Sequence, residues 1–165
     1  MTMTNEELKD RMNRFQPPTG ILLGMEMLEV DIEAGRVRVK YQPGPEFTNP
    51  MGSVQGGIVV AMLDDAAAFA AIAKSGTRIS VPSIELKTSF FAPVKAGVPV
   101  YVEGRCLKLG KRIAFMEAEM TDGEGRVLAK LSTSAVPIEI PQGGGNLVER
   151  SDQKAERSEH KESRK

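Results

Sequence analysis

Residues 49–76 read NPMGSVQGGIVVAMLDDAAAFAAIAKSG, and this stretch decides the fold. From Ile58 to Ala73 every residue is apolar except Asp64 and Asp65. Glycines stand before and after the run, as is typical of the two ends of a helix. The pattern therefore predicts one long helix from about Val54 to Ser75. Because this helix is apolar around nearly its whole circumference, we expect it to be buried.

Strand patterns lie on both sides of the expected helix. The segment LEVDIEAGRVRVKY (28–41) predicts a hairpin that turns at Ala34-Gly35, with Glu33 facing Arg36. In this register opposite charges line one face and β-branched residues line the other. After the helix, Pro and Gly turns separate four further strands, expected at about 82–91, 98–109, 112–121 and 126–137.

These elements predict an α+β protein in which an antiparallel sheet is wrapped around a long central helix. The alanines of the helix allow neighbouring backbone to approach closely. A sheet of this kind has open edges, so we expect two copies of the chain to associate strand to strand.

Shorter segments flank this expected domain, which covers residues 20–140. Thr4 and Glu7 form a capping box that predicts a helix to about Phe15, so residues 1–19 are interpreted as an N-terminal helix and linker. Residues 141–165 contain few apolar side chains, and we expect them to be a disordered polar tail.

Composition narrows the possible functions. The chain has 22 basic and 22 acidic residues, and this balance argues against binding to nucleic acid or to a membrane surface. The longest apolar run is cut by the two aspartates, so no membrane span is expected. Cys106 is the one cysteine, so an intrachain disulfide is impossible and we expect a soluble protein of the reducing cytoplasm. We interpret Cys106 itself as a core residue rather than a nucleophile.

The one histidine, His160, lies in the polar tail. Without a histidine in the folded part, Ser-His-Asp and Cys-His catalysis and histidine-based zinc sites are excluded. Any chemistry must use carboxylates, amides, hydroxyls and backbone groups, and we expect no metal site.

The two adjacent aspartates need an explanation, because burying a carboxylate without partners is costly. Successive helical residues differ in direction by about 100°, so Asp64 and Asp65 cannot share one environment. Both could emerge at a solvent-exposed edge of the helix. Alternatively, one lies in a cleft at a subunit interface and serves catalysis. The glycines at the helix start favour the second interpretation, because free N–H groups there can hold an oxyanion.

The stretch also resembles a known family. Asn49, Gln55-Gly56-Gly57 and Asp64 have the spacing found in hotdog-fold acyl-CoA thioesterases of the phenylacetate-pathway and 4-hydroxybenzoyl-CoA branch. That branch has Asn, then His-Gly-Gly six residues later, then an acidic residue nine after the His. The resemblance covers about residues 20–138 and includes FFAPV (90–94), LGKR (109–112) and DGEGRVLAKLSTS (122–134).

The resemblance implies a hotdog fold and hydrolysis of an acyl-CoA to the free acid and coenzyme A, with no metal or redox cofactor. Asp64 would be the nucleophile or general base, and the Gly56 N–H would be the oxyanion donor. Asn49, across a dimer interface from Asp64, would position the thioester or the water. Ser83 matches a serine that orients water in some members, but it can equally be a strand-edge hydroxyl.

The resemblance also implies which residues contact the substrate, and this chain differs from the family at one site position. Gly57 would contact the substrate, and Lys111 and Arg112 would bind the phosphates of coenzyme A, unless they are simply solvated. Gln55 stands where the family usually has His, and glutamine cannot titrate. The expected assembly is a homodimer or a dimer of dimers. The alternative function is a non-catalytic acyl-CoA-binding or sensing module.

Overall fold

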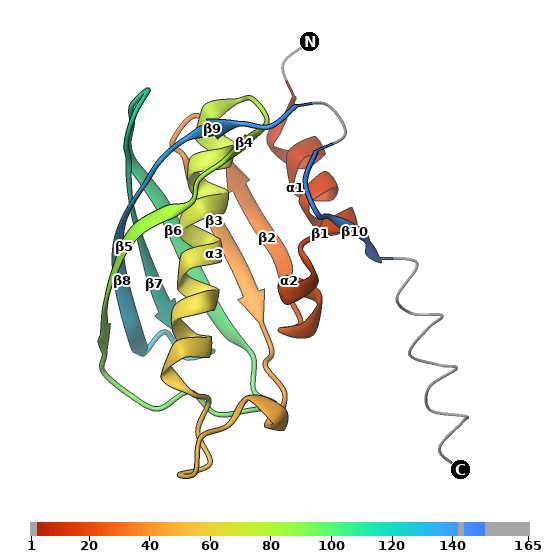
Figure 1. The fold of residues 1–165 in the computed structure, drawn as a ribbon. Coiled ribbons are helices and arrows are strands. Elements are labelled where there is room, and N and C mark those ends of the chain that lie inside the picture. The colour runs from red at the N-terminus through yellow and green to blue at the C-terminus, as the bar shows by residue number, and fades with distance from the viewer. Residues whose placement is uncertain (1–2, 142–143, 151–165) are drawn as a thin grey trace.

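The central helix α3 spans Gly56–Ser75 and lies along the inner face of a six-stranded sheet (Figure 1). The computed structural model describes residues 3–141 and 144–150. Gly76 ends α3 in the left-handed conformation, with φ of 62°. The predicted helix is therefore confirmed to within two residues at its start. Its fully buried side chains face the sheet: Val59, Met62, Leu63, Ala66, Ala67, Ala70, Ala71 and Ala73.

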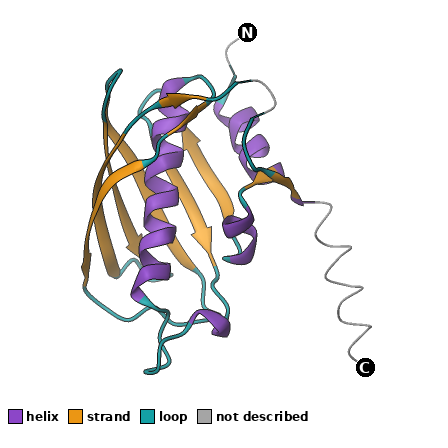
Figure 2. Cartoon of the chain, in the orientation of Figure 1, coloured by secondary structure: helices purple, strands orange, loops and turns teal. Residues whose placement is uncertain are grey.

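The sheet is antiparallel, with strand order β2-β3-β6-β7-β8-β5 (Figures 1 and 2). Its strands are β2 (Glu26–Asp31), β3 (Arg36–Tyr41), β5 (Ser83–Phe90), β6 (Val100–Leu109), β7 (Ala114–Thr121) and β8 (Val127–Ala135). The four strands expected after the helix are all present. Strand β5 forms one edge of the sheet and contacts α3.

The β2–β3 hairpin forms, but the predicted register is wrong by two residues. Asp31 rather than Glu33 pairs with Arg36, and residues 32–35 form the turn. The Asp31 carboxylate accepts a hydrogen bond of 2.9 Å from the Ala34 N–H, and Gly35 has φ of 64°, so the longer turn is stabilised locally. A shift of two residues keeps each side chain on its face, so the predicted polar and apolar faces are retained.

Strand β6 approaches α3 closely at Gly104. A Cβ at this position would lie 2.1 Å from the carbonyl oxygen of Ala66 and 3.0 Å from the Ala67 nitrogen. Glycine on the strand and alanines on the helix therefore let two backbones pack together, as the alanine-rich sequence predicts.

The N-terminal segment contains α1 (Asn5–Arg14), β1 (Phe15–Gln16) and α2 (Pro18–Leu22). The predicted capping box is confirmed, because Thr4 and Glu7 exchange both hydrogen bonds.

Phe47 ends a short 3-10 helix, Pro45–Phe47, in the loop before α3. A second short pair joins β4 (Ile79–Ser80) to β9 (Ile138–Glu139).

The prediction of a disordered tail from residue 141 needs correction. Strand β10 (Val148–Glu149) pairs antiparallel with β1, so this part of the tail is ordered by a partner strand rather than by apolar burial. Residues 142–143 and 151–165 lie outside the described residues.

Helix α3 is also long and apolar enough to cross a membrane, in spite of its two aspartates. This corrects the expectation that the aspartates would rule out such a helix by composition. One side of α3 is buried against the sheet, which is the usual position of a core helix.

Candidate active site

The start of α3 presents free backbone donors. Gln55 is the N-cap residue and makes no side-chain capping bond, and its side chain is exposed. Among the described residues, the N–H groups of Gly56 and Gly57 have no hydrogen-bond acceptor. These two groups lie at the positive end of a helix of 20 residues, where an oxyanion is stabilised.

Asp64 and Ser83 are in direct contact. The Ser83 hydroxyl donates a hydrogen bond of 2.7 Å to Oδ1 of Asp64. Alternation along the strand groups Ser83 with Glu85 and Lys87 on the polar face, but a register shift between Ser83 and Glu85 changes the direction of the first residue. The bulge thus places a serine hydroxyl against the central helix.

Asp64 and Gly56 do not meet within one chain. They are eight residues apart on α3, which corresponds to about 12 Å along the helix axis. A carbonyl group held by the Gly56 N–H is therefore out of reach of the Asp64 carboxylate of the same chain.

The Asn49 side chain organises the loop before α3. Its Oδ1 accepts hydrogen bonds from the N–H groups of Met51 (2.9 Å) and Ser53 (3.3 Å), and its Nδ2 donates to the Ser53 hydroxyl (3.0 Å). One amide hydrogen of Asn49 remains for another acceptor. The loop therefore fixes the orientation of this amide next to the helix start.

A cavity of about 400 Å³ adjoins the helix start. The Phe90 ring lies over Gly56, so that a Cβ on Gly56 would be 3.3 Å from its Cζ atom. The other lining residues are Asn49, Ser53, Val54, Val59, Phe91, Ala92, Pro93 and Val94. The cavity is mostly apolar with polar groups at one side, which suits an acyl group and its thioester.

Lys111 and Arg112 are exposed in the turn between β6 and β7, and neither makes an ion pair in the described part of the chain. The pairings of Ala114 with Ala135 and of Ala135 with Ser83 place this turn at the Ser83 end of the sheet. Two strand spacings, about 10 Å, separate it from Ser83. The two cations therefore lie nearer to Ser83 and Asp64 than to the start of α3 at Gly56.

Asp65 points about 100° away from Asp64 around the axis of α3. Burial, and secondly the charge of Asp64, raises the pKa of Asp65 to about 7. The neighbouring phenol of Tyr41, at the end of β3, is wholly buried and has no hydrogen-bond partner among the described residues. Burial and the charge of Asp65 raise the pKa of Tyr41. The sequence shows the two aspartates but not that Asp65 lies near Tyr41, because β3 is distant from α3 along the chain.

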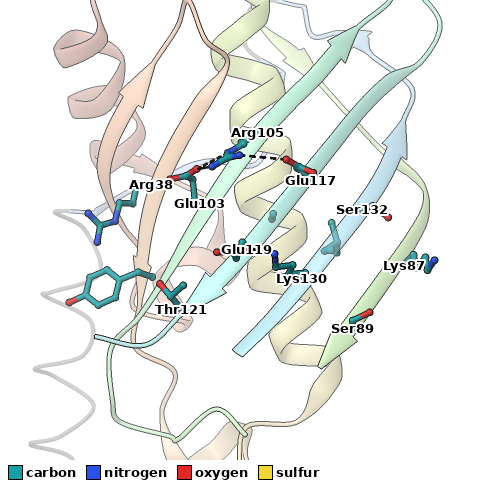
Figure 3. Close-up of a pocket in the computed structure, with 13 residues that line it drawn as sticks. Arg38, Lys87, Ser89, Glu103, Arg105, Glu117, Glu119, Thr121, Lys130 and Ser132 are labelled. Carbon is teal, nitrogen blue, oxygen red and sulfur yellow. Dashed lines mark hydrogen bonds and ion pairs between the residues drawn. The ribbon is translucent and has the colours of Figure 1, made fainter. Parts of the chain in front are cut away.

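A second hollow, of about 530 Å³, lies on the outer face of the sheet (Figure 3). Its charges compensate one another: Arg105 pairs with Glu103 (2.5 Å) and Glu117 (3.9 Å), and Lys130 pairs with Glu119 (2.7 Å). The sheet separates this hollow from α3, so it is not part of the candidate site.

The described residues contain no group of three or more His, Cys, Asp or Glu side chains that could hold a metal ion.

Comparison with known proteins identifies the family. A sequence profile of the thioesterase superfamily matches residues 51–129. Human acyl-coenzyme A thioesterase 13 is 24% identical over 102 residues, which cover 61% of this chain and 72% of the relative.

Solved structures of similar fold support the same family. The phenylacetic acid degradation-related protein of Ralstonia eutropha JMP134 has a TM-score of 0.67 and 30% identity, covering 73% of this chain and 90% of that one. A thioesterase protein of Streptococcus pneumoniae TIGR4, solved with coenzyme A, has a TM-score of 0.62 and 17% identity, covering 70% and 89%. The chain therefore belongs to the thioesterase superfamily, and its six-stranded sheet around one long helix is the hotdog fold.

Proposed function

We propose that the protein is an acyl-CoA thioesterase that hydrolyses an acyl-CoA to the free acid and coenzyme A. The observation that carries the proposal is the contact of 2.7 Å between Ser83 and Asp64, on the helix that also begins with free N–H groups. Human acyl-coenzyme A thioesterase 13 and the coenzyme A complex of the Streptococcus pneumoniae protein support the substrate class.

The proposed reaction uses groups of this chain. Asp64 takes a proton from water, and the water oxygen attacks the thioester carbon. The oxyanion accepts a hydrogen bond from the Gly56 N–H, and Asn49 helps to position the thioester. The C–S bond then breaks, and the thiolate of coenzyme A receives the proton from Asp64. In the other route the Asp64 carboxylate itself attacks the carbon, and the C–S bond breaks to release the thiolate of coenzyme A. Water then hydrolyses the resulting anhydride to the free acid and the Asp64 carboxylate, and a proton released in this step neutralises the thiolate. The scheme requires no metal or redox cofactor.

The proposed site is shared between two chains. Strand β5 is an open edge, and Ile84 and Leu86 on it are 57% and 42% exposed. If two β5 strands pair antiparallel about their centres, Ser83 lies opposite Phe90 of the partner subunit. Asp64 then faces the partner's helix start, which overcomes the separation of about 12 Å within one chain. We therefore propose a homodimer as the smallest active unit, with a dimer of dimers as the alternative.

Further residues would contact the substrate. Gln55 can donate a hydrogen bond to the thioester carbonyl but cannot transfer a proton. Gly57 would add a second N–H at the helix start. Lys111 and Arg112 would bind the phosphates of coenzyme A, since they make no ion pair within the described chain and lie on the Ser83 side of the sheet. A cytoplasmic location, where coenzyme A esters are available, remains part of the proposal.

A thiol-release assay tests this function with short, medium, long and aromatic acyl-CoAs. We expect release of coenzyme A from at least one of them at a rate that depends on enzyme concentration. The second candidate is a non-catalytic acyl-CoA-binding module, and Gln55 in place of the family's histidine favours it. Binding of a non-hydrolysable acyl-CoA without any thiol release from the series would establish the binding module instead.

A further inference from the structure

The two edges of the sheet differ, and the β2 edge is closed by side chains. An edge strand normally presents unpaired N–H and C=O groups to solvent. At Met27, however, the side-chain amide of Asn13 bonds both groups: Nδ2 donates to the carbonyl at 2.9 Å, and Oδ1 accepts from the N–H at 2.7 Å. This is the donor and acceptor pair that one residue of an added antiparallel strand would supply.

The same closure occurs at both ends of β2. Gln16 Nε2 donates to the Met25 carbonyl at 3.1 Å, and the Met25 N–H donates to the Gly20 carbonyl at 2.8 Å. At the other end, Asn5 Oδ1 accepts from the Ile32 N–H at 3.0 Å. Three side-chain amides of one N-terminal segment thus bond backbone groups at Met25, Met27 and Ile32, at both ends of β2 and within it.

The amides are held in place by packing and by the C-terminal strand. Met12 is buried in the core, and Gln16 is 1% exposed. Strand β10 pairs with β1, and the Arg14 Nε atom lies 2.7 Å from Oε1 of Glu149. Figure 1 shows α1, β1 and β10 together on the β2 side of the molecule. We define residues 4–16 with residues 148–149 as the edge strap.

The opposite edge has no such cover. In the part of the chain that the structure describes, no strand or helix lies along the outer edge of β5. The outer edge of β2 could otherwise pair with a further strand. We propose that the edge strap covers this edge and so prevents the addition of a strand from another copy of the chain. With the strap in place, the sheet of another copy cannot be extended from β2; with the strap open, β2 becomes a surface for strand addition. This inference does not depend on catalysis.

The first test compares wild type with Asn13→Ala, which leaves both Met27 groups without partners. Asp10→Ala, an exposed change on the same helix, is the matched control. Hydrogen exchange at the Met27 amide should be at least 10-fold faster in Asn13→Ala than in wild type or the control. In light scattering, only Asn13→Ala should show a mass that rises with protein concentration. Unchanged exchange and unchanged mass in Asn13→Ala would overturn the proposal.

A second pair of variants covers the case in which Asn13→Ala does not fold. Arg14→Glu places like charges at the contact with Glu149 and should open the strap, with faster exchange at Met27 and a growing mass. Adding Glu149→Arg should restore slow exchange and a constant mass, because the ion pair is rebuilt with the charges exchanged. Failure of the double variant to restore both readouts, when Arg14→Glu alone has changed them, would contradict the role of the C-terminal strand.

Discussion

The Ser83 hydroxyl lies 2.7 Å from the Asp64 carboxylate, and this contact joins the open edge strand β5 to the central helix α3. It puts the candidate catalytic carboxylate beside the surface through which we propose that two chains associate.

Asp64→Asn keeps the size of the side chain and its hydrogen bond to Ser83 but removes the basicity. We expect kcat for acyl-CoA hydrolysis to fall by about 100-fold or more. Ser83→Ala should cause a smaller loss, of about 10-fold, on the scale of one hydrogen bond to a charged group. Asp65→Asn is the matched control and should keep most of the activity, because Asp65 points about 100° away from Asp64 around the helix axis. A dead Asp65→Asn enzyme with an active Asp64→Asn enzyme would show that the site is assigned to the wrong aspartate.

Gly56→Pro tests the oxyanion donor directly. Proline is well tolerated at the first position of a helix, and it removes the N–H in question. We expect kcat to fall by about 100- to 1000-fold, the usual loss for one oxyanion-hole donor. Gly56→Ala keeps the N–H and adds a carbon at the same place, where it meets the Phe90 ring at 3.3 Å. Equal losses in the two variants would indicate crowding by Phe90 rather than loss of a donor.

Mixed dimers test whether the site is shared. Asp64→Asn and Gly56→Pro should each be inactive as the pure protein. In a mixed dimer, one site receives Asp64 from the Gly56→Pro chain and Gly56 from the Asp64→Asn chain, so that site is intact. After unfolding and refolding together at equal amounts, activity should return to about a quarter of wild type, since half of the dimers are mixed. No recovery, with mixed dimers demonstrated by native mass spectrometry, would place both groups of a site in one chain.

Asp65 should make the free energy of unfolding depend on pH. Its pKa is about 7 in the folded protein, against 3.8 for a free side chain, so the folded state holds the proton more tightly. The resulting stabilisation is complete below about pH 4 and is lost as the pH rises through 7. Relative to wild type, Asp65→Asn should therefore gain stability between pH 4 and pH 8, by at most about 4 kcal/mol.

Urea unfolding of both proteins across this pH range measures the gain. Asp10→Asn, at an exposed position, should show no comparable change relative to wild type. A constant difference between wild type and Asp65→Asn at all pH values would mean that Asp65 titrates normally.

Gly104→Ala should destabilise the fold more than any ordinary surface change. The added carbon would lie 2.1 Å from the Ala66 carbonyl oxygen, and relief requires α3 and β6 to separate. We expect a loss of about 3 kcal/mol or more in the free energy of unfolding. Gly123→Ala, in a turn with no atom within 4 Å of the new carbon, should change stability little. Equal melting temperatures for the two variants would contradict the close approach of helix and strand.

Much of this fold could be predicted from local sequence patterns. The apolar run ended by Gly76 predicts α3, and Thr4 with Glu7 predicts the start of α1, because these signals act within a few residues. The hairpin register does not follow from the sequence pattern, because polar and apolar residues alternate in the same way in both registers. The Asp31 side chain selects the register with the longer turn. Alternation also assigned Ser83 to the outer face, and only the bulge after it turns the hydroxyl toward α3.

Contacts between distant segments could not be predicted in the same way. The pairing of β10 with β1 joins the two ends of the chain, and the tail is too polar to suggest a strand. The proximity of Asp65 to Tyr41 depends on which flank of α3 faces β3. The resemblance to the thioesterase family supplied the candidate residues, but the separation of Gly56 from Asp64 within one chain became clear only from the structure.

The position of α3 in the chain has a consequence for synthesis on the ribosome. The helix emerges after β2 and β3 but before β5, β6, β7 and β8, so most of the sheet that covers it does not yet exist. At about 5–20 residues per second, its apolar side stays without that cover for several seconds. During this period the apolar side of the nascent helix is exposed to aggregation, and slower translation after residue 76 would lengthen the exposure.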